Sequence, residues 1–370
     1  MIKKYISENK NLIISILGVL AFLLIIFAAV KLVNSNKIAA PENTEQLVSG
    51  DKEILQEKDI QNKVNQADIA KQLNVTILLD LSDRIARITD WNGQKFDKGF
   101  VPLERDLSVI NTIIDILKED ALKGSKSGRD KLIDLKSKIK FLCIPKPKDH
   151  QINFDKLKID FSDKKYNGSN SKLILKNNLF NSLSNLTKQH KDSNGQETSG
   201  ELNKIYNDIL ATNSFPGSDI WKFFEQYAKS YCIDKNYRNI LVIFTDGYIY
   251  HEDSIYREGN RYSYLTSRLL NAYNLRAENL TREAIKQKIE QLDFGFITRT
   301  NGLNNLEVLI VEVLPDKKRK FDGYVIEEVL TKWLKEMGVT HSEILFSNED
   351  SDLTASRIRD FFDDNPQNLN

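Results

Sequence analysis

The chain has few of the residues that build disulfide frameworks, metal clusters or fibrous repeats. Its 370 residues include 2 cysteines, 4 histidines, 16 glycines and 7 prolines. Cys143 and Cys232 lie far apart, which excludes a disulfide scaffold and a cysteine zinc site but leaves open whether the two pair or stay reduced. A hydrophobic content of 41% further excludes collagen-like and wholly disordered chains.

The chain also lacks a dominant charge and the common catalytic motifs. With 53 Lys+Arg against 52 Asp+Glu the formal charge is +1, so no net field would draw the chain to nucleic acid. The sequence contains no G-x-S-x-G elbow, no G-x-x-x-x-G-K phosphate loop and no H-E-x-x-H pair. We therefore expect neither an enzyme nor a nucleic-acid partner.

A long uncharged segment lies near the N-terminus. Residues 12–30 (LIISILGVLAFLLIIFAAV) carry no charge, and a helix rising about 1.5 Å per residue would cross a hydrocarbon core of about 30 Å. A cleaved signal peptide usually has a shorter apolar region of about 7–15 residues and a small-residue cleavage site, which does not follow here. The segment predicts a retained transmembrane helix over residues 12–33, after a tail of residues 1–11.

The flanks of this helix suggest its orientation and a spacer. The positive-inside rule favours a cytoplasmic N-terminus by a small excess of lysines, Lys3, Lys4 and Lys10 before the helix against Lys31 and Lys37 after it. The larger part of the chain would then lie outside the cytoplasm, tethered to the cell membrane. Residues 34–72 are polar and charge-mixed, which indicates a stalk or linker.

Beyond the stalk, apolar runs of strand length alternate with helical patterns. Strands are expected at residues 75–79, 140–144, 157–161, 240–244, 306–314 and 343–346, of which 157–161 alternates and so lies nearer an edge. Helices are expected at residues 107–122, 173–186, 202–210, 219–231, 326–337 and 353–362. The alternation predicts an α/β domain over residues 73–370, with a mostly parallel, doubly wound (Rossmann-like) sheet flanked by helices.

Two of the apolar strands end in carboxylates set among small polar residues. Residues 80–84 (DLSDR) follow the first strand, and residues 245–247 (TDG) follow the strand at 240–244. Between them, Ser218 and Asp219 open a helix that either residue is placed to cap. Ligands of such sheets bind beyond the carboxyl ends of the strands, so we expect these residues to meet there.

In this order the segments ILLDLSD, PGSDI and LVIFTDG resemble the von Willebrand factor type A family over about residues 73–362. Members of that family carry D-x-S-x-S after the first strand, a threonine before a middle helix and T-D-G after the next buried strand. Together these form a metal-ion-dependent adhesion site. The resemblance implies four metal ligands here, namely Asp80, Ser82, Ser218 and Asp246.

Carboxylate and hydroxyl oxygens suit a hard cation such as Mg²⁺, with Mn²⁺ or Ca²⁺ as alternatives. The resemblance implies that an open position on the cation accepts a carboxylate from a protein partner. Four neighbours would modulate the site: Asp83, Arg84, Asp219 and Thr245. Arg84 stands where the family has its second serine, so its guanidinium either points away or replaces the cation in an ion pair with Asp80 or Asp246.

Two insertions also depart from the family pattern, near residues 85–105 and 248–303. The second leaves the carboxyl end of a central strand and contains many tyrosines. We expect it to overhang the site, where tyrosine and arginine would serve as interface anchors, or to form an ordinary surface excursion with its tyrosines packed beneath it. Trp91, Trp221 and Trp333 are expected to be packing residues.

These features predict a single-pass, membrane-anchored protein-binding module. An alternative is a structural subunit of a membrane complex whose site binds no metal, since some bacterial proteins of similar architecture work beside ring ATPases or envelope assemblies. A phosphate- or ester-hydrolysing enzyme is a weaker alternative, because residues 80–82 (DLS) lack the second aspartate of the D-x-D motif of haloacid-dehalogenase phosphatases.

Overall fold

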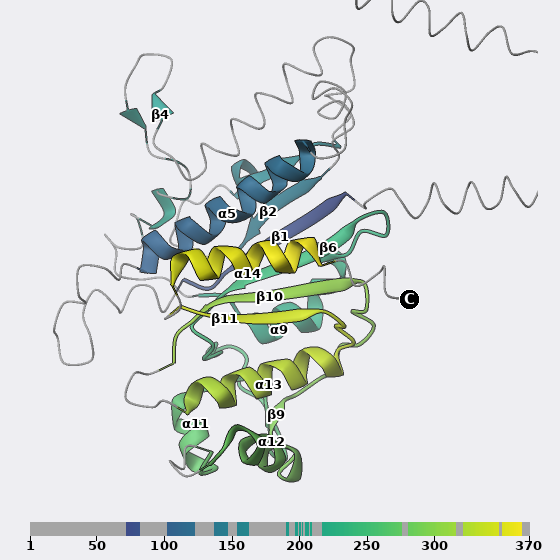
Figure 1. The fold of residues 1–370 in the computed structure, drawn as a ribbon. Coiled ribbons are helices and arrows are strands. Elements are labelled where there is room, and N and C mark those ends of the chain that lie inside the picture. Colours follow the sequence, from purple (N-terminus) through teal and green to yellow (C-terminus); the bar gives the residue numbers. More distant parts are fainter. Residues whose placement is uncertain are drawn as a thin grey trace, which may run out of the picture. The chain divides into compact units, whose positions relative to one another are not determined.

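A six-stranded sheet organises the part of the chain that the computed structural model describes (Figure 1). That part consists of residues 72–81, 102–122, 137–146, 154–162, 190–191, 197–198, 200, 202, 204–206, 208, 217–275, 280–315, 321–347 and 350–364. None of the helices in these ranges is long and apolar enough to span a membrane. The tail, the expected transmembrane helix and almost all of the expected stalk lie outside the described residues.

The strand order in the sheet is β11-β10-β6-β1-β2-β3, and every pairing is parallel except that of β2 with β3. The strands are β1 (Leu73–Leu79), β2 (Lys138–Leu142), β3 (Lys158–Asp160), β6 (Arg238–Phe244), β10 (Leu306–Val313) and β11 (Ser342–Phe346). The expected mostly parallel α/β sheet is confirmed, and so is the edge position of β3. Successive strands add to one side of β1 and then to the other, so the order reverses between β1 and β6.

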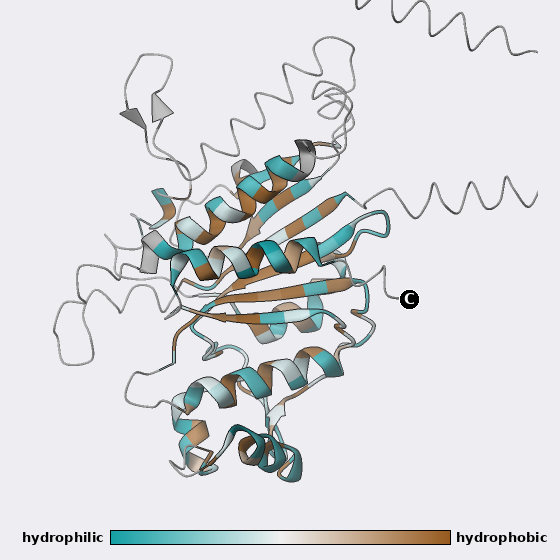
Figure 2. Cartoon of the chain, viewed as in Figure 1, coloured by the Kyte–Doolittle hydropathy of each residue, from teal (hydrophilic) through white to brown (hydrophobic). Residues whose placement is uncertain are grey.

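Helices cover both faces because the central strands are apolar on both sides. β1, β6 and β10 are buried throughout, and Figure 2 shows these strands as largely hydrophobic bands. On one face α5 (Pro102–Leu122) and α14 (Ser351–Asp363) lie side by side. The core of the other face includes residues of α9 (Ile220–Gln226), α10 (Ala228–Cys232) and α13 (Asp322–Glu336).

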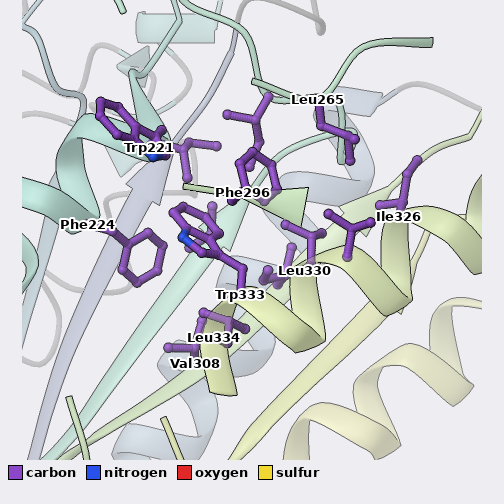
Figure 3. Close-up of a cluster of buried hydrophobic side chains, with 14 of the residues drawn as sticks. Trp221, Phe224, Leu265, Phe296, Val308, Ile326, Leu330, Trp333 and Leu334 are labelled. Carbon is purple, nitrogen blue, oxygen red and sulfur yellow. The ribbon is translucent and has the colours of Figure 1, made fainter. Parts of the chain in front are cut away.

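Aromatic rings fill the second core (Figure 3). The Trp333 ring lies 4.4 Å from that of Phe296 and 4.9 Å from that of Phe224, measured between centroids. The Trp221 indole nitrogen donates a hydrogen bond of 2.9 Å to the Ile297 carbonyl. Both tryptophans are therefore packing residues, as expected, while Trp91 lies outside the described residues.

The excursion after T-D-G forms a small subassembly on the outer side of α13 (Figure 1). Its elements are β7 (Arg257–Glu258), β8 (Arg261–Tyr262), α11 (Ser267–Ala272), α12 (Arg282–Gln291) and β9 (Gly295–Phe296). Arg261 connects this subassembly to α13 by an ion pair of 2.6 Å with Glu336, and it also pairs with Asp293 of the subassembly at 2.7 Å. Tyr262 is buried among other rings, whereas Tyr250 remains 53% exposed. Most of the excursion thus packs against α13.

The helix expected at residues 219–231 is two helices, because the backbone departs from helical geometry at Tyr227 (φ −123°, ψ −31°). Tyr231, in the second of these helices, is 43% exposed. A short 3-10 helix (Phe154–Leu157) precedes β3, and β4 (His190–Lys191) pairs with β5 (Glu197–Thr198). The helix expected at residues 173–186 lies outside the described residues, as does part of the one at 202–210.

Candidate functional site

The carboxyl ends of β1 and β6 lie next to each other where the strand order reverses. Leu79 pairs with Phe244 in the parallel register, and the Asp80 amide continues the ladder with a bond of 3.0 Å to the Phe244 carbonyl. Neighbouring strands are about 4.8 Å apart, so the segments that start with Asp80 and Thr245 leave the sheet side by side. This reversal point is where doubly wound sheets bind their ligands.

Ser218 joins this pair from the loop before α9. Its backbone amide donates to Asp80 Oδ1 at 3.2 Å, and its hydroxyl donates to the Leu79 carbonyl at 2.7 Å. The same oxygen accepts from the Ile144 amide at 3.2 Å. These bonds fasten the loop to the ends of β1 and β2. Since a hydroxyl oxygen has two lone pairs, the Ile144 amide leaves one of them for a further electrophile.

Asp246 and Thr245 shape the turn that follows β6. Asp246 Oδ1 accepts from the Tyr248 amide at 2.8 Å, and Thr245 Oγ1 accepts from the Gly247 amide at 3.2 Å. Gly247 has φ +90°, a conformation that side chains with a Cβ rarely adopt. Asp80, Thr245 and Asp246 are all buried, so two carboxylates lie away from bulk water where β1 and β6 end.

Asp219 has a structural role in the described residues. Its Oδ1 accepts from the Lys222 amide at 3.0 Å, which makes it the N-cap of α9, as the sequence indicates. Its Oδ2 accepts from the Ser254 hydroxyl, and His251 Nδ1 lies 3.7 Å from the same oxygen. Asp219 therefore ties the first segment of the excursion to α9, beside Ser218.

Three of the four expected ligands thus come from segments that meet at one place. Asp80 and Asp246 would supply carboxylate oxygens, and Ser218 would supply a hydroxyl oxygen, which is a donor set that fits a hard cation. The described residues contain no group of three or more His, Cys, Asp or Glu placed to hold a metal, so the two carboxylates would depend on hydroxyls or water to complete a site. Ser82, Asp83 and Arg84 lie outside the described residues.

Sequence reasoning missed a buried ion pair at the end of the neighbouring strand β10. Glu312 is buried at φ +63°, where the β10–β11 register shifts, and Arg105 of α5 binds it through Nε at 2.9 Å and Nη2 at 3.1 Å. Two parallel N–H···O bonds of this kind are strong and directional. The signal was Glu312 itself, one of two glutamates in the largely apolar run LEVLIVEV, because buried carboxylates need a partner.

The two cysteines are not paired. Both are buried free thiols, and burial raises the pKa of each to about 12 from its ordinary value of 9.0. Cys143 lies beside the candidate site, with its sulfur 3.3 Å from the Ser218 hydroxyl.

We expect neither thiol to react with a disulfide reagent such as DTNB at pH 8 in the folded chain, because the reactive thiolate is scarce and the sulfur atoms are covered. The measurement is the absorbance of released thionitrobenzoate, with the chain in guanidinium as the control in which both thiols react. Fast labelling of the native chain would contradict this assignment.

Comparisons of the chain with protein-family models, with curated proteins and with solved structures found no match.

Proposed function

We propose that this chain is a single-pass, membrane-anchored binding module, similar to von Willebrand factor type A domains, that engages a protein partner outside the cytoplasm. A divalent cation at the carboxyl ends of β1 and β6, most simply Mg²⁺, would accept a carboxylate of that partner. The uncharged segment at residues 12–30 supports the anchor, and residues 34–72 support a stalk that holds the domain away from the bilayer.

One observation carries the proposal. Asp80 and the 245–247 turn leave adjacent parallel strands at the reversal of strand order, and the Ser218 amide donates to Asp80 Oδ1 at 3.2 Å. Three segments that are distant in sequence therefore converge at the place where this class of sheet binds ligands.

Each residue of the site would have a defined task. The cation supplies an electrophilic centre with an open position, since Mg²⁺ keeps octahedral geometry and retains several waters. Asp80 and Asp246 would provide negative charge, which the cation balances where two like charges come close. Ser218 holds its loop against β1 and would offer its remaining lone pair.

A second candidate is a structural subunit of a membrane complex whose site holds no metal. It is favoured by the existing bonds of the site, because the Ser218 hydroxyl proton binds the Leu79 carbonyl and Asp246 Oδ1 holds the Tyr248 amide. In that case Arg84 would provide the compensating positive charge.

Calorimetric titration of MgCl₂ into the full chain in detergent micelles tests the proposal. We expect saturable binding that is weakened about tenfold or more by Asp80→Asn, the loss expected for a charged ligand, and strengthened by Arg84→Ser. Asp115→Asn on α5 is the matched control, because this carboxylate is half exposed and forms an ion pair with its helix neighbour Lys118. Absence of binding in both the wild type and Arg84→Ser would favour the structural subunit instead.

A further inference from the structure

A cavity of about 180 Å³ lies near the start of β1, at the opposite end of that strand from the candidate site. β2, β3 and the C-terminal end of α10 form its walls, and it reaches Asn74 near the start of β1. Three lysines line it, Lys138 and Lys140 from β2 and Lys158 from β3. The candidate site lies beyond the other end of β1, so this cavity is separate from it.

The strand register brings the three lysines together on one face. Lys138 and Lys140 are two residues apart on β2, so their side chains point to the same side of the sheet. Across the antiparallel pairing, Lys140 lies opposite Lys158 and Lys138 lies opposite Asp160. Like charges placed directly opposite each other on neighbouring strands are destabilising.

The carboxylates of the cavity gather at one end. Lys138 has an ion pair of 2.9 Å with Asp234, sits 4.1 Å from the centre of the Tyr237 ring and faces Asp160 across the strands. Lys140 donates instead to a neutral acceptor, the Tyr231 carbonyl. Among the described residues, no carboxylate lies within ion-pair distance of Lys140 or Lys158. The three lysines of the cavity thus outnumber its two carboxylates, and Lys140 and Lys158 form no ion pair with either of them in the described residues.

The titration of Lys140 agrees with this geometry. Burial lowers the pKa of its ammonium below the ordinary 10.5, and the charges of Lys158 and Lys138 act in the same direction, while Cys232 and Asp160 act in the opposite one. A bound anion near Lys140 would raise this pKa.

We propose that this cavity binds a phosphoryl group, as inorganic phosphate or a small phosphate ester, through Lys140 and Lys158. A phosphoryl group has three acceptor oxygens and a charge of about −1.5 to −2 at pH 7, so separate oxygens of one group can bind the ammonium groups of both lysines. Lysine binds phosphate as a point charge on a flexible stem, so two lysines on opposing strands can close on one anion.

The first test is the rate at which an acylating reagent modifies Lys140 in the full chain at pH 8.5, followed by mass spectrometry of the peptide. We expect inorganic phosphate to slow the modification about tenfold or more, while chloride at the same ionic strength does not, because a bound anion raises the pKa of Lys140 and covers its amine. Glycerol 3-phosphate in place of inorganic phosphate shows whether an ester is also accepted. Equal protection by phosphate and chloride would overturn the proposal. The lysines would then serve only to keep the edge strand from pairing with another chain.

The second test is phosphate-dependent thermal stability of Lys140→Gln/Lys158→Gln. Phosphate should raise the Tm of the wild type and leave that of the double variant unchanged, because only a ligand that binds the folded state stabilises it. Lys118→Gln is the matched control, because it removes a lysine of α5 that is 22% exposed and lies outside the cavity, and it should respond like the wild type. Because the measured quantity is the shift that phosphate causes and not the Tm itself, a phosphate response retained in the double variant would count directly against the site.

Discussion

Replacing Arg238 with methionine is expected to lower the free energy of unfolding by about 3–5 kcal/mol. Arg238 is buried at the start of β6, where it binds Glu307 of β10 through bonds of 2.8 Å from Nε and 2.7 Å from Nη2. Removing the guanidinium would leave Glu307 as a buried carboxylate without its main partner, which is the costly way to break a buried ion pair.

The same guanidinium also closes the C-terminal end of α14. It donates to the carbonyls of Phe361 at 3.0 Å and Asp364 at 2.6 Å, and to that of Phe362. The carbonyls of Phe361 and Phe362 lie in the last turn of the helix and that of Asp364 directly follows it, so none of them has an intrahelical partner. Arg238 thus holds together β6, β10 and the last helix, so its loss should also loosen the packing of α14 on the sheet.

Urea denaturation at pH 7 measures the effect, with Arg257→Met on the exposed strand β7 as the control, expected within about 0.5 kcal/mol of the wild type. The double variant Arg238→Met/Glu307→Leu should recover part of the loss, because removing both charges costs less than removing one. A single variant as stable as the wild type would show that the pair contributes little.

The ion pair should also make stability fall in acid. Burial alone would raise the pKa of Glu307, but the hydrogen bonds from Arg238 and His341 outweigh it, so the pKa lies below its ordinary 4.5. A lowered folded-state pKa gives stability that is present above the unfolded value and is lost as the pH falls through the folded value. The wild type should therefore lose stability below about pH 4.5 more steeply than Arg238→Met/Glu307→Leu.

Local sequence patterns were enough to predict the sheet. The runs that became β1, β6 and β10 are apolar on both faces, which only strands covered by helices on both sides can be. Alternation in the short run that became β3 also identified an edge strand. The break at Tyr227 could not be predicted in this way, because the periodicity of the helix runs on through it.

Of the candidate site, the sequence predicted only which residues follow the parallel strands and would therefore meet. Asp80 and Asp246 each follow a parallel strand, and the carboxyl ends of such strands lie on the same side of the sheet. The bonds of Ser218 to Leu79 and Ile144, by contrast, depend on how a loop closes over the edge, which no short pattern specifies. The Arg105–Glu312 pair joins residues 207 positions apart, so only the packing of α5 on the sheet reveals it.

Gly247→Ala should destabilise the chain by about 2–5 kcal/mol, the second large effect we expect. The residue follows Asp246 in the turn after β6 and has φ +90°, which strains any residue with a Cβ. An added Cβ would also lie 2.7 Å from Ile326 Cγ2 and 3.0 Å from Val313 Cγ1, both buried side chains of the second core. Strain and overpacking therefore act together at this position.

Gly259→Ala separates the two causes. Gly259 also has a left-handed backbone, at φ +61°, but an added Cβ there would meet no atom within 4 Å. Its substitution should cost about 1–2 kcal/mol, the strain alone, so the difference between the variants in urea denaturation reports the clash with Ile326 and Val313. Equal losses in both variants would show that the turn relaxes away from the core. If Gly247→Ala folds, it should also bind Mg²⁺ less tightly than Gly259→Ala, because the shift needed to relieve the clash moves Asp246 while Gly259 lies in the excursion on α13.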